Sequence, residues 1–440
     1  MASSVTAWGD ETAGRRLILR DVGQLVTVAG HSDAPARTGQ LGQIGLVEDG
    51  WLVVEAGRIA ALGPMESYDR AWEAPPAGAD EVGVEVLSLP AAVVTPGLVD
   101  PHTHALFGGW RADEWSARVG GATYEEIMAR GGGILSTVAA TRAASDTELT
   151  ANLGRSLRLM AAAGTTTAEV KSGYGLSTEQ ELRLLRILRQ AADDPSAPVR
   201  VVPTFLGAHA IPPERAADRA GYVREITEEM LPAIARQGLS RFCDVFCDEG
   251  AFTVAEAEAI LCRGNELGLS ARLHADELAA VGAAELAARL GARSADHLLR
   301  ATPTGLQAMA RAGVIATLLP GTAFYLGKSY ADARLLRDMG LPLALASDYN
   351  PGTSVLCDMR LVMTLACTYM GLTPGEALVA ATINGAHVLG LAAETGSLEV
   401  GKAADLAIWE LPDYRHLTYQ VGGNPLVRLL RSGRTVFARE

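Results

Sequence analysis

Two histidines stand two residues apart at the end of the segment VVTPGLVDPHTH, residues 93–104. Residues two apart in a β-strand point to the same face, so the imidazoles of His102 and His104 are expected to aim at one point. A third histidine, His274, and a carboxylate, Asp348, come at the ends of later apolar runs. Three imidazole nitrogens and one carboxylate oxygen suit Zn²⁺ or Fe²⁺. An HxH pair also arises by chance, but the later histidine and carboxylate favour a metal site.

A metal ion at such a site would make hydroxide available at neutral pH, because it lowers the pKa of bound water toward about 7. Asp348 is a candidate acceptor for the proton of that water, and His297 is a candidate to polarise an oxygen or to orient the water. Each of these two residues could instead have a purely structural role. His297 could be a hydrogen-bonded core histidine, and Asp348 could cap the turn that begins at Asn350.

Eight apolar runs, separated by helix-compatible segments, are the elements that must position these residues. The runs are 93–104, 165–175, 199–210, 243–250, 270–278, 294–299, 313–321 and 343–352. The segments between them, such as TEQELRLLRILRQAA, have high helix propensity. Eight parallel strands alternating with helices predict the α/β class and a (β/α)₈ TIM-type barrel. Active sites of such barrels lie at the C-terminal strand ends, where most of the eight histidines fall.

Both ends of the chain carry short β-type runs bounded by turn signals. Near the N-terminus these are RLILRDVGQLVTV and the pair WLVVEAG and RIAALG. Near the C-terminus DLAIWEL and RTVFARE follow the helical pattern GEALVAATINGAHVLGL. We therefore expect residues 1–92 and 391–440 to form one small, discontinuous β-sandwich domain beside a barrel of residues 93–390.

Composition limits the classes of partner. The 440 residues include 38 Lys and Arg against 51 Asp and Glu, which gives a formal net charge of −13. A negative field without a Lys/Arg run opposes binding to nucleic acid or to an anionic membrane. The five cysteines form no CxxC pair, the N-terminus lacks a signal-peptide pattern, and no apolar run approaches the roughly 18 residues of a membrane span. We expect a cytoplasmic protein.

Longer motifs resemble the amidohydrolase superfamily: TPGLVDPHTH, LHADE, ADHL, ASDYNPG, TPGEALVAATINGAHVLGL and GSLEVGKAADLAIW. Four further segments are similar to the imidazolonepropionase family within it: FGGWRADEWSARVGGATYEEIMARGGGILSTV, EVKSGYGLSTEQELRLLR, PTFLGAHAIPPE and FCDVFCDEGAFT. The resemblance covers essentially the whole chain. It implies a metal-dependent hydrolase of a cyclic amide, which converts 4-imidazolone-5-propanoate and water to N-formimidoyl-L-glutamate during histidine breakdown.

The resemblance also implies a role for each matching residue. The implied ligands of one divalent or trivalent metal ion, Zn or Fe, are His102, His104, His274 and Asp348. The implied substrate-binding residues are Arg111, Tyr174, His209, Glu277, Asn350, Gly352 and Thr353. The implied catalytic residues are Glu277, His297 and Asp348. Homodimers are common in the family, so a homodimer is expected.

Physical chemistry assigns these residues plausible tasks. Arg111 can bind the propanoate carboxylate bidentately, and Tyr174 can stack on the ring or donate a hydrogen bond to it. His209 can contact the ring or its carbonyl oxygen. Glu277 can carry a proton between the water and a ring nitrogen, although Asp348 could serve as the sole base. The loop that contains Asn350 could receive the substrate or could only form a turn.

Other interpretations are less favoured. A carbamylated Lys171 could bridge two metals, but an ion-pair role is preferred because Lys171 falls on the second predicted strand. Asp248 and Glu249 on the fourth strand leave a carboxylate-bridged pair of metals as a minority option. A deaminase of a nucleobase-like ring is the enzymatic alternative. A catalytically inactive paralogue that acts as a scaffold is disfavoured because all four candidate ligands are present.

Overall fold

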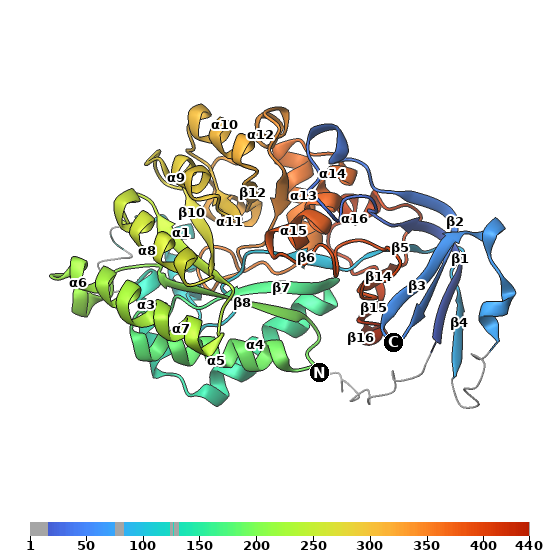
Figure 1. Ribbon diagram of the computed structural model, residues 1–440, viewed down its shortest axis with the longest axis horizontal. Coiled ribbons are helices and arrows are strands. Elements are labelled where there is room, and N and C mark those ends of the chain that lie inside the picture. Colours follow the sequence, from blue (N-terminus) through green and yellow to red (C-terminus); the bar gives the residue numbers. More distant parts are fainter. Residues whose placement is uncertain (1–15, 75–82, 124–125, 127–131, 440) are drawn as a thin grey trace.

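The computed structural model contains two eight-stranded sheets, one parallel and one mixed, and it describes residues 16–74, 83–123, 126 and 132–439. The parallel sheet and its helices form a broad body, and the mixed sheet lies at one side of it (Figure 1). Both ends of the described chain contribute strands to the mixed sheet. No helix of the described residues is long and apolar enough to cross a membrane.

The parallel sheet follows the chain order from β6 to β13 without a crossover, as a (β/α)₈ barrel requires. Its strands are β6 (Leu98–Asp100), β7 (Thr165–Lys171), β8 (Arg200–Ala208), β9 (Phe242–Cys247), β10 (Ser270–Ala275), β11 (Ser294–His297), β12 (Ile315–Leu318) and β13 (Leu343–Leu345). Seven of these strands lie within the predicted apolar runs, and β9 begins one residue before its run of 243–250. The predicted barrel class is therefore confirmed.

Hydrogen bonds beyond β6 and β13 join the first and last strands of the barrel. Thr103 forms a parallel bridge with Tyr349. The His104 N–H donates to the Tyr349 carbonyl at 2.8 Å, and the Asp348 N–H donates to the His102 carbonyl at 3.1 Å. This seam places three of the four candidate metal ligands on adjacent segments. His102 and His104 thus lie just beyond β6 rather than within it.

Helices cover the outside of the barrel (Figure 1). They are α1 (Ala112–Val119), α3 (Ile134–Ala143), α4 (Asp146–Ala162), α5 (Thr178–Asp193), α6 (Arg219–Arg224), α7 (Leu231–Gln237), α8 (Val254–Glu266), α9 (Ala283–Leu290), α10 (Pro303–Ala312), α11 (Pro320–Leu326), α12 (Ala333–Asp338), α13 (Met359–Met370), α14 (Pro374–Ala380), α15 (Ile383–Val388) and α16 (His416–Tyr419). Helix α4 shows why such segments are helical. Ser145 and Glu148 form its capping box, and Leu149, Leu153 and Leu157 form a buried stripe at helical spacing.

The mixed sheet has the strand order β16-β15-β14-β5-β1-β2-β3, and β4 pairs with β1. Its strands are β1 (Arg16–Val26), β2 (Leu46–Glu55), β3 (Arg58–Pro64), β4 (Val84–Ser88), β5 (Val93–Pro96), β14 (Leu406–Trp409), β15 (Leu426–Arg431) and β16 (Arg434–Ala438). The apolar run 93–104 is therefore divided at Gly97, because β5 joins the mixed sheet and β6 begins the barrel. The expected domain limits stay a prediction.

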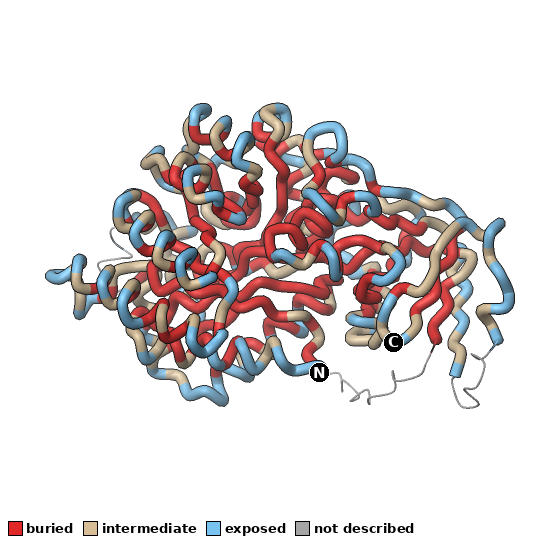
Figure 2. The backbone as a smooth tube through the Cα atoms, in the orientation of Figure 1, coloured by how far each residue is buried: buried red, intermediate tan, exposed pale blue. Residues whose placement is uncertain are grey.

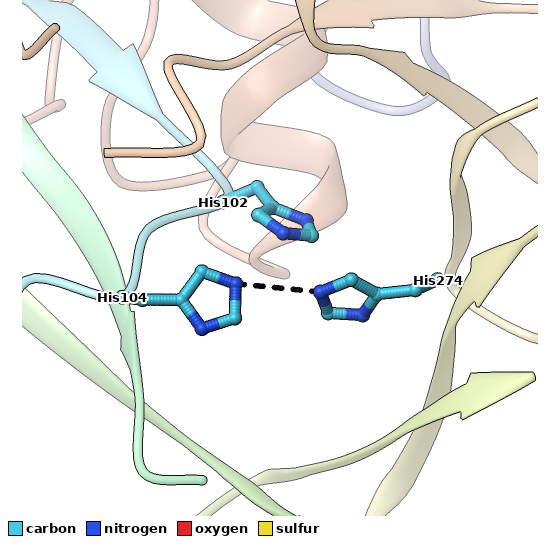
Figure 3. A group of neighbouring side chains, drawn as sticks. All are labelled: His102, His104 and His274. Atoms are coloured by element: carbon cyan, nitrogen blue, oxygen red, sulfur yellow. Dashed lines mark hydrogen bonds between the residues drawn. The ribbon is translucent and has the colours of Figure 1, made fainter. Parts of the chain in front are cut away.

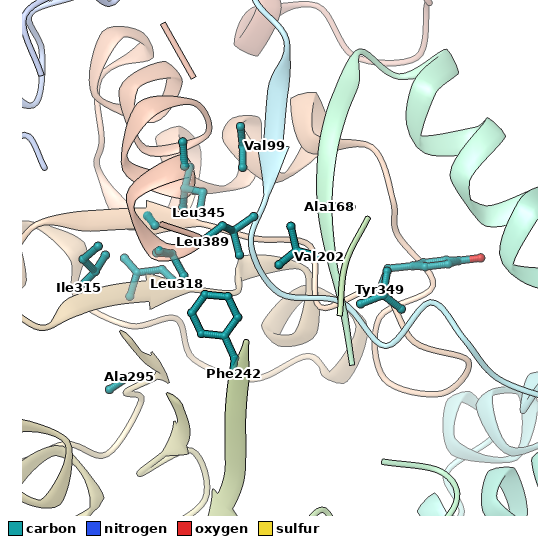
Figure 4. Close-up of a cluster of buried hydrophobic side chains, with 14 of the residues drawn as sticks. Val99, Ala168, Val202, Phe242, Ala295, Ile315, Leu318, Leu345, Tyr349 and Leu389 are labelled. Carbon is teal, nitrogen blue, oxygen red and sulfur yellow. The ribbon is translucent and has the colours of Figure 1, made fainter. Parts of the chain in front are cut away.

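Apolar side chains of the barrel strands and helices pack into one buried core (Figure 4), and the backbone of the barrel strands is buried along most of its length (Figure 2). Val99, Val202, Phe242, Leu318 and Leu345 are among these side chains, each from a different strand.

Strand β14 joins the core of the mixed sheet to that of the barrel. Leu406 and Ile408 pack in the core of the mixed sheet, whereas Ala407 and Trp409 pack in the barrel core. This alternation follows the two-residue period of a strand. Trp409 is fully buried and its Nε1–H donates to Thr95 Oγ1 at 2.9 Å.

We expect Gly164→Ala to destabilise the protein by about 2–4 kcal/mol, because the new methyl group would clash and the backbone would be strained. Gly164 has φ +96°, and a Cβ there would lie 2.3 Å from the Trp409 ring. Chemical denaturation measures the loss. Gly238→Ala is the control, since Gly238 has φ +60° with nothing within 4 Å, and it should cost only about 1 kcal/mol. Equal losses in the two variants would show that Trp409 does not limit this position.

Candidate metal centre and active site

Three buried histidines converge at the C-terminal end of the barrel (Figure 3). His102 and His104 follow β6, and His274 lies in β10. One nitrogen from each ring lies within 4.8 Å of the other two. The Nε2 atoms of His104 and His274 are 3.3 Å apart, and His102 Nε2 has no hydrogen-bond partner in the described residues.

The donor set of these histidines fits a metal ion. His102 Nδ1 lies 2.6 Å from Asp296 Oδ2, and His274 Nδ1 lies 3.2 Å from Asp244 Oδ1. A carboxylate accepts hydrogen bonds, so we assign the protons of both rings to Nδ1 and the lone pairs to Nε2. Lone pairs that face one another in a buried space, as those of His102 and His274 then do, need a cation between them.

Asp348 supplies an oxygen to the same space. Its Oδ1 lies 3.5 Å from His104 Nε2 and 3.7 Å from His102 Nε2. Its Oδ2 accepts a hydrogen bond from the Thr322 hydroxyl at 2.5 Å, which fixes the carboxylate. Asp348 therefore has one oxygen free for a metal or a water proton.

Burial controls the charge of the candidate ligands. Burial, together with Lys171 and the neighbouring histidines, holds the pKa of His102 well below its usual range, and the pKa of His104 is lowered in the same way. Burial also lowers the pKa of His274, but Asp244 outweighs it and the net shift is upward. Burial raises the pKa of Asp348. His102 and His104 are thus neutral at pH 7, the form that binds metals.

His297 and Glu277 lie beside this group. The His297 ring centroid is 5.7 Å from that of His102 and 5.4 Å from that of His274. Its Nε2 is buried without a hydrogen-bond partner and lies 3.7 Å from Glu277 Oε2. His297 has φ +76°, a left-handed conformation that costs energy for a residue with a side chain and is common at functional sites.

Tyr174 and His209 form a wall next to His104. The rings of His104 and His209 stack at 5.0 Å, and Tyr174 lies 6.0 Å from His104 and 5.4 Å from His209. His209 Nδ1 donates to the Gly173 carbonyl at 3.0 Å, so its Nε2 carries a lone pair. Burial lowers the pKa of His209 to about 3, which keeps the ring neutral. Burial raises the pKa of the Tyr174 hydroxyl, which therefore stays a donor.

Arg111 lies directly against the backbone of Gly352. A Cβ on Gly352 would come within 1.7 Å of Arg111 Nη2, so only glycine leaves room for this guanidinium. The Arg111 side chain is 9% exposed, its Nε has no hydrogen-bond partner among the described residues, and its Nη1 is 3.9 Å from Glu114 Oε2. A buried guanidinium with free donors is suited to bind a carboxylate.

Asn350 organises the loop after β13. Its Oδ1 accepts hydrogen bonds from the N–H groups of Gly352 and Thr353, at 2.9 and 2.7 Å, and from the Thr353 hydroxyl. Its Nδ2 donates to the Asp348 carbonyl at 2.7 Å. The Asn350 side chain thus shapes the turn that carries Gly352 and Asp348. Direct contact of Asn350 or Thr353 with a substrate stays a prediction.

Lys171 and the carboxylates of the fourth strand serve other purposes. Lys171 Nζ lies 2.7 Å from both Glu169 Oε1 and Asp244 Oδ2, so the preferred ion-pair interpretation agrees with the geometry. Asp248 directs its oxygens to the N–H groups of residues 277–279, and Glu249 is exposed. A single metal therefore stays the preferred interpretation.

The residues missed in the sequence lie beneath the histidines: Glu169, Asp244, Arg272 and Asp296, all fully buried. Each one interrupts an apolar strand with a charge, and each lies within three residues of a histidine, Lys171 or a buried cysteine. A charged residue in a parallel strand that is buried on both faces must have a partner of opposite charge. The sequence therefore already indicated that these four residues are paired. Their partners are on other strands, so the pairs themselves could not be predicted.

Comparison with known proteins agrees with this geometry. A sequence model of the Amidohydrolase family matches residues 93–436. An imidazolonepropionase of Geobacillus kaustophilus is 48% identical over 423 residues, which cover 96% of this chain and 98% of that protein. The chain belongs to the imidazolonepropionase family of amidohydrolases. Another imidazolonepropionase, from Symbiobacterium thermophilum, is also 48% identical and covers 96% of the chain and 97% of its own length.

Solved structures support the fold of this imidazolonepropionase-family chain. E. coli guanine deaminase superposes with a TM-score of 0.69 at 16% identity, covering 97% of this chain and 100% of that one. A zinc-bound adenosine deaminase from Xanthomonas campestris gives 0.66 at 20% identity, covering 95% and 92%. At such low identity these likenesses support the amidohydrolase barrel alone.

We expect His274→Ala to weaken metal binding by at least about 100-fold, because it removes one ligand. Elemental analysis of the purified, desalted protein measures the metal retained. The matched control is His416→Ala, since His416 lies in α16 outside the histidine group and its side chain, among the described residues, contacts Gln420 and the Tyr419 ring. Full metal content in His274→Ala would exclude this histidine as a ligand.

Proposed function

We propose that this protein opens the ring of 4-imidazolone-5-propanoate by hydrolysis and forms N-formimidoyl-L-glutamate. The single observation that carries the proposal is 48% identity over 96% of the chain to an imidazolonepropionase. The buried histidine group supports it independently, because it fits a metal ion. Expectations of a homodimer and of a cytoplasmic location stay predictions.

The proposed ligands of one Zn or Fe ion are His102, His104, His274 and Asp348. When bound, such an ion supplies Lewis acidity and lowers the pKa of a coordinated water toward about 7. Asp348 is the proposed acceptor of the water proton, because its Oδ1 is free and close to His102 and His104.

Two further residues complete the proposed proton transfers. Addition of water breaks the bond between the ring carbonyl carbon and a ring nitrogen, and that nitrogen needs a proton. Glu277 is proposed to deliver it, because Glu277 lies beside the group at 3.7 Å from His297. His297, with an unpartnered buried Nε2, is proposed to donate a hydrogen bond to the oxyanion.

The anionic arm of the substrate accounts for the basic residue at the mouth of the site. The net charge of −13 repels an anion at long range, so local positive charge must compensate. Arg111 is the proposed partner of the propanoate carboxylate, and Gly352 leaves the space that its guanidinium occupies. Tyr174 and His209 are proposed to contact the ring. A nucleobase-like deaminase substrate would have no carboxylate to use Arg111.

We expect purified, metal-loaded protein to remove the ultraviolet absorbance of 4-imidazolone-5-propanoate without releasing ammonia. Hydrolysis of the ring C–N bond retains both nitrogens in the product, whereas a deaminase releases one as ammonia. Absorbance and an ammonia assay in the same sample separate the two functions. Full turnover by metal-free protein, or stoichiometric ammonia, would overturn the proposal. Metal-loaded protein with no turnover would favour an inactive scaffold.

Arg111→Met should raise KM for this substrate about 10- to 100-fold with unchanged metal content, because a charge-assisted bidentate contact is lost. Gly352→Ala should also raise KM, since its methyl group displaces the Arg111 guanidinium. Steady-state kinetics and elemental analysis measure both effects. Arg118→Met is the control for loss of a positive charge nearby, since Arg118 lies in α1, which Arg111 precedes as the N-cap residue. An unchanged KM in Arg111→Met would show that the carboxylate binds elsewhere.

A further inference from the structure

Five fully buried charged residues form a connected network beneath the histidine group: Glu169, Lys171, Asp244, Arg272 and Asp296. Lys171 Nζ lies 2.7 Å from Glu169 and from Asp244. Arg272 lies 3.1 Å from Glu169 and 3.0 Å from Asp296. Three carboxylates and two cations on four strands thus pair through Glu169 at the centre. Burying five charges is costly, so their retention calls for a function.

The network also holds the backbone on both sides of His102. Arg272 Nη2 donates to the Pro101 carbonyl at 2.7 Å. Glu169 Oε2 accepts from the Thr103 N–H at 3.1 Å, and the Thr103 hydroxyl donates to the Glu169 carbonyl at 2.7 Å. The position of His102 is therefore set by charges on two other strands.

The two aspartates contact their histidines in different ways. Asp244 uses both oxygens, since Oδ1 faces His274 Nδ1 at 3.2 Å and Oδ2 faces Lys171 Nζ at 2.7 Å. Asp296 uses one oxygen, since Oδ2 faces both His102 Nδ1 at 2.6 Å and Arg272 Nη2 at 3.0 Å. Within the part of the chain that the structure describes, Asp296 Oδ1 has no hydrogen-bond partner.

We infer that Asp244 and Asp296 are positioning residues that hold the protons of His274 and His102 on Nδ1 and leave each Nε2 as a metal ligand. This inference rests on the proposed metal site and extends it to the residues that set the tautomers. Hydrogen bonds from outer carboxylates orient ligating histidines generally. In this protein, the ion network decides which oxygen is available to each ring.

The difference between the aspartates gives a sharp test with asparagine variants. In Asp244→Asn, Lys171 draws the amide oxygen toward itself and turns the NH₂ group to His274 Nδ1. The His274 ring must then accept a hydrogen bond at Nδ1 and carry its proton on Nε2. A protonated Nε2 cannot bind a metal ion. In Asp296→Asn, one amide oxygen serves both His102 and Arg272, and the NH₂ group takes the unpartnered position. The His102 tautomer is retained.

The experiment measures the Zn²⁺ affinity of the full-length protein by competition with a chromophoric chelator. Asp244→Asn should weaken binding by about 100-fold, and Asp296→Asn by less than about tenfold. Lys171→Met should bind at least as tightly as the wild type, because Asp244 keeps its oxygen for His274 and a repelling cation is lost. Asp405→Asn is the control and should not change affinity. Asp405 is a buried aspartate that pairs with Arg200 at 3.1 Å, away from the histidines.

The visible spectrum of the Co²⁺-loaded variants gives a second readout, since loss of a ligand changes the ligand field. Circular dichroism identifies any variant that does not fold. If one of Asp244→Asn, Asp296→Asn and Lys171→Met does not fold, the other two are compared. Equal losses in Asp244→Asn and Asp296→Asn, or a comparable loss in Lys171→Met, would overturn the inference in favour of purely structural ion pairs. A wild type that binds no Zn²⁺, Fe²⁺ or Co²⁺ would overturn the proposed function and this inference together.

Discussion

The constraint on which the proposed metal site depends is that three imidazoles must present lone pairs to one point in the buried end of the barrel. Burial makes charged histidine costly and keeps His102 and His104 neutral. Neutral imidazole has two tautomers, and only the one with its proton on Nδ1 directs Nε2 inward. The buried carboxylates beneath His102 and His274 meet this requirement, and the cations beside them make burial of those carboxylates possible.

Barrel closure brings the proposed metal ligands together. The first and last strands are joined beyond their ends by hydrogen bonds at Thr103 and Tyr349, and the backbone of His102 is bonded to that of Asp348. The same bonds that complete the barrel thus fix the distance between the histidine pair and the carboxylate. The mixed sheet supports this arrangement from outside, because β14 places Trp409 in the barrel core.

The substrate side is built from loops shaped by short polar contacts. The Asn350 side chain bonds to the turn after β13, and the Asp248 carboxylate accepts from the Glu277 N–H. Gly352, which has no side chain, leaves room for the Arg111 guanidinium. These contacts position groups without occupying the site. An acidic protein can in this way present one buried guanidinium to an anion such as the proposed substrate, because local charge dominates at contact distance.

The sequence alone determined the barrel, its eight strands, the HxH pair and the other candidate ligands, because hydrophobic periodicity and residue types are local properties. It could not divide residues 93–104 between two sheets, since the division at Gly97 depends on which strands pair. It also did not identify Asp244 or Asp296 as partners of His274 and His102. Those contacts join residues 30 and 194 positions apart. Only the closed barrel decides which buried charges meet, because its strand register sets which side chains share the interior.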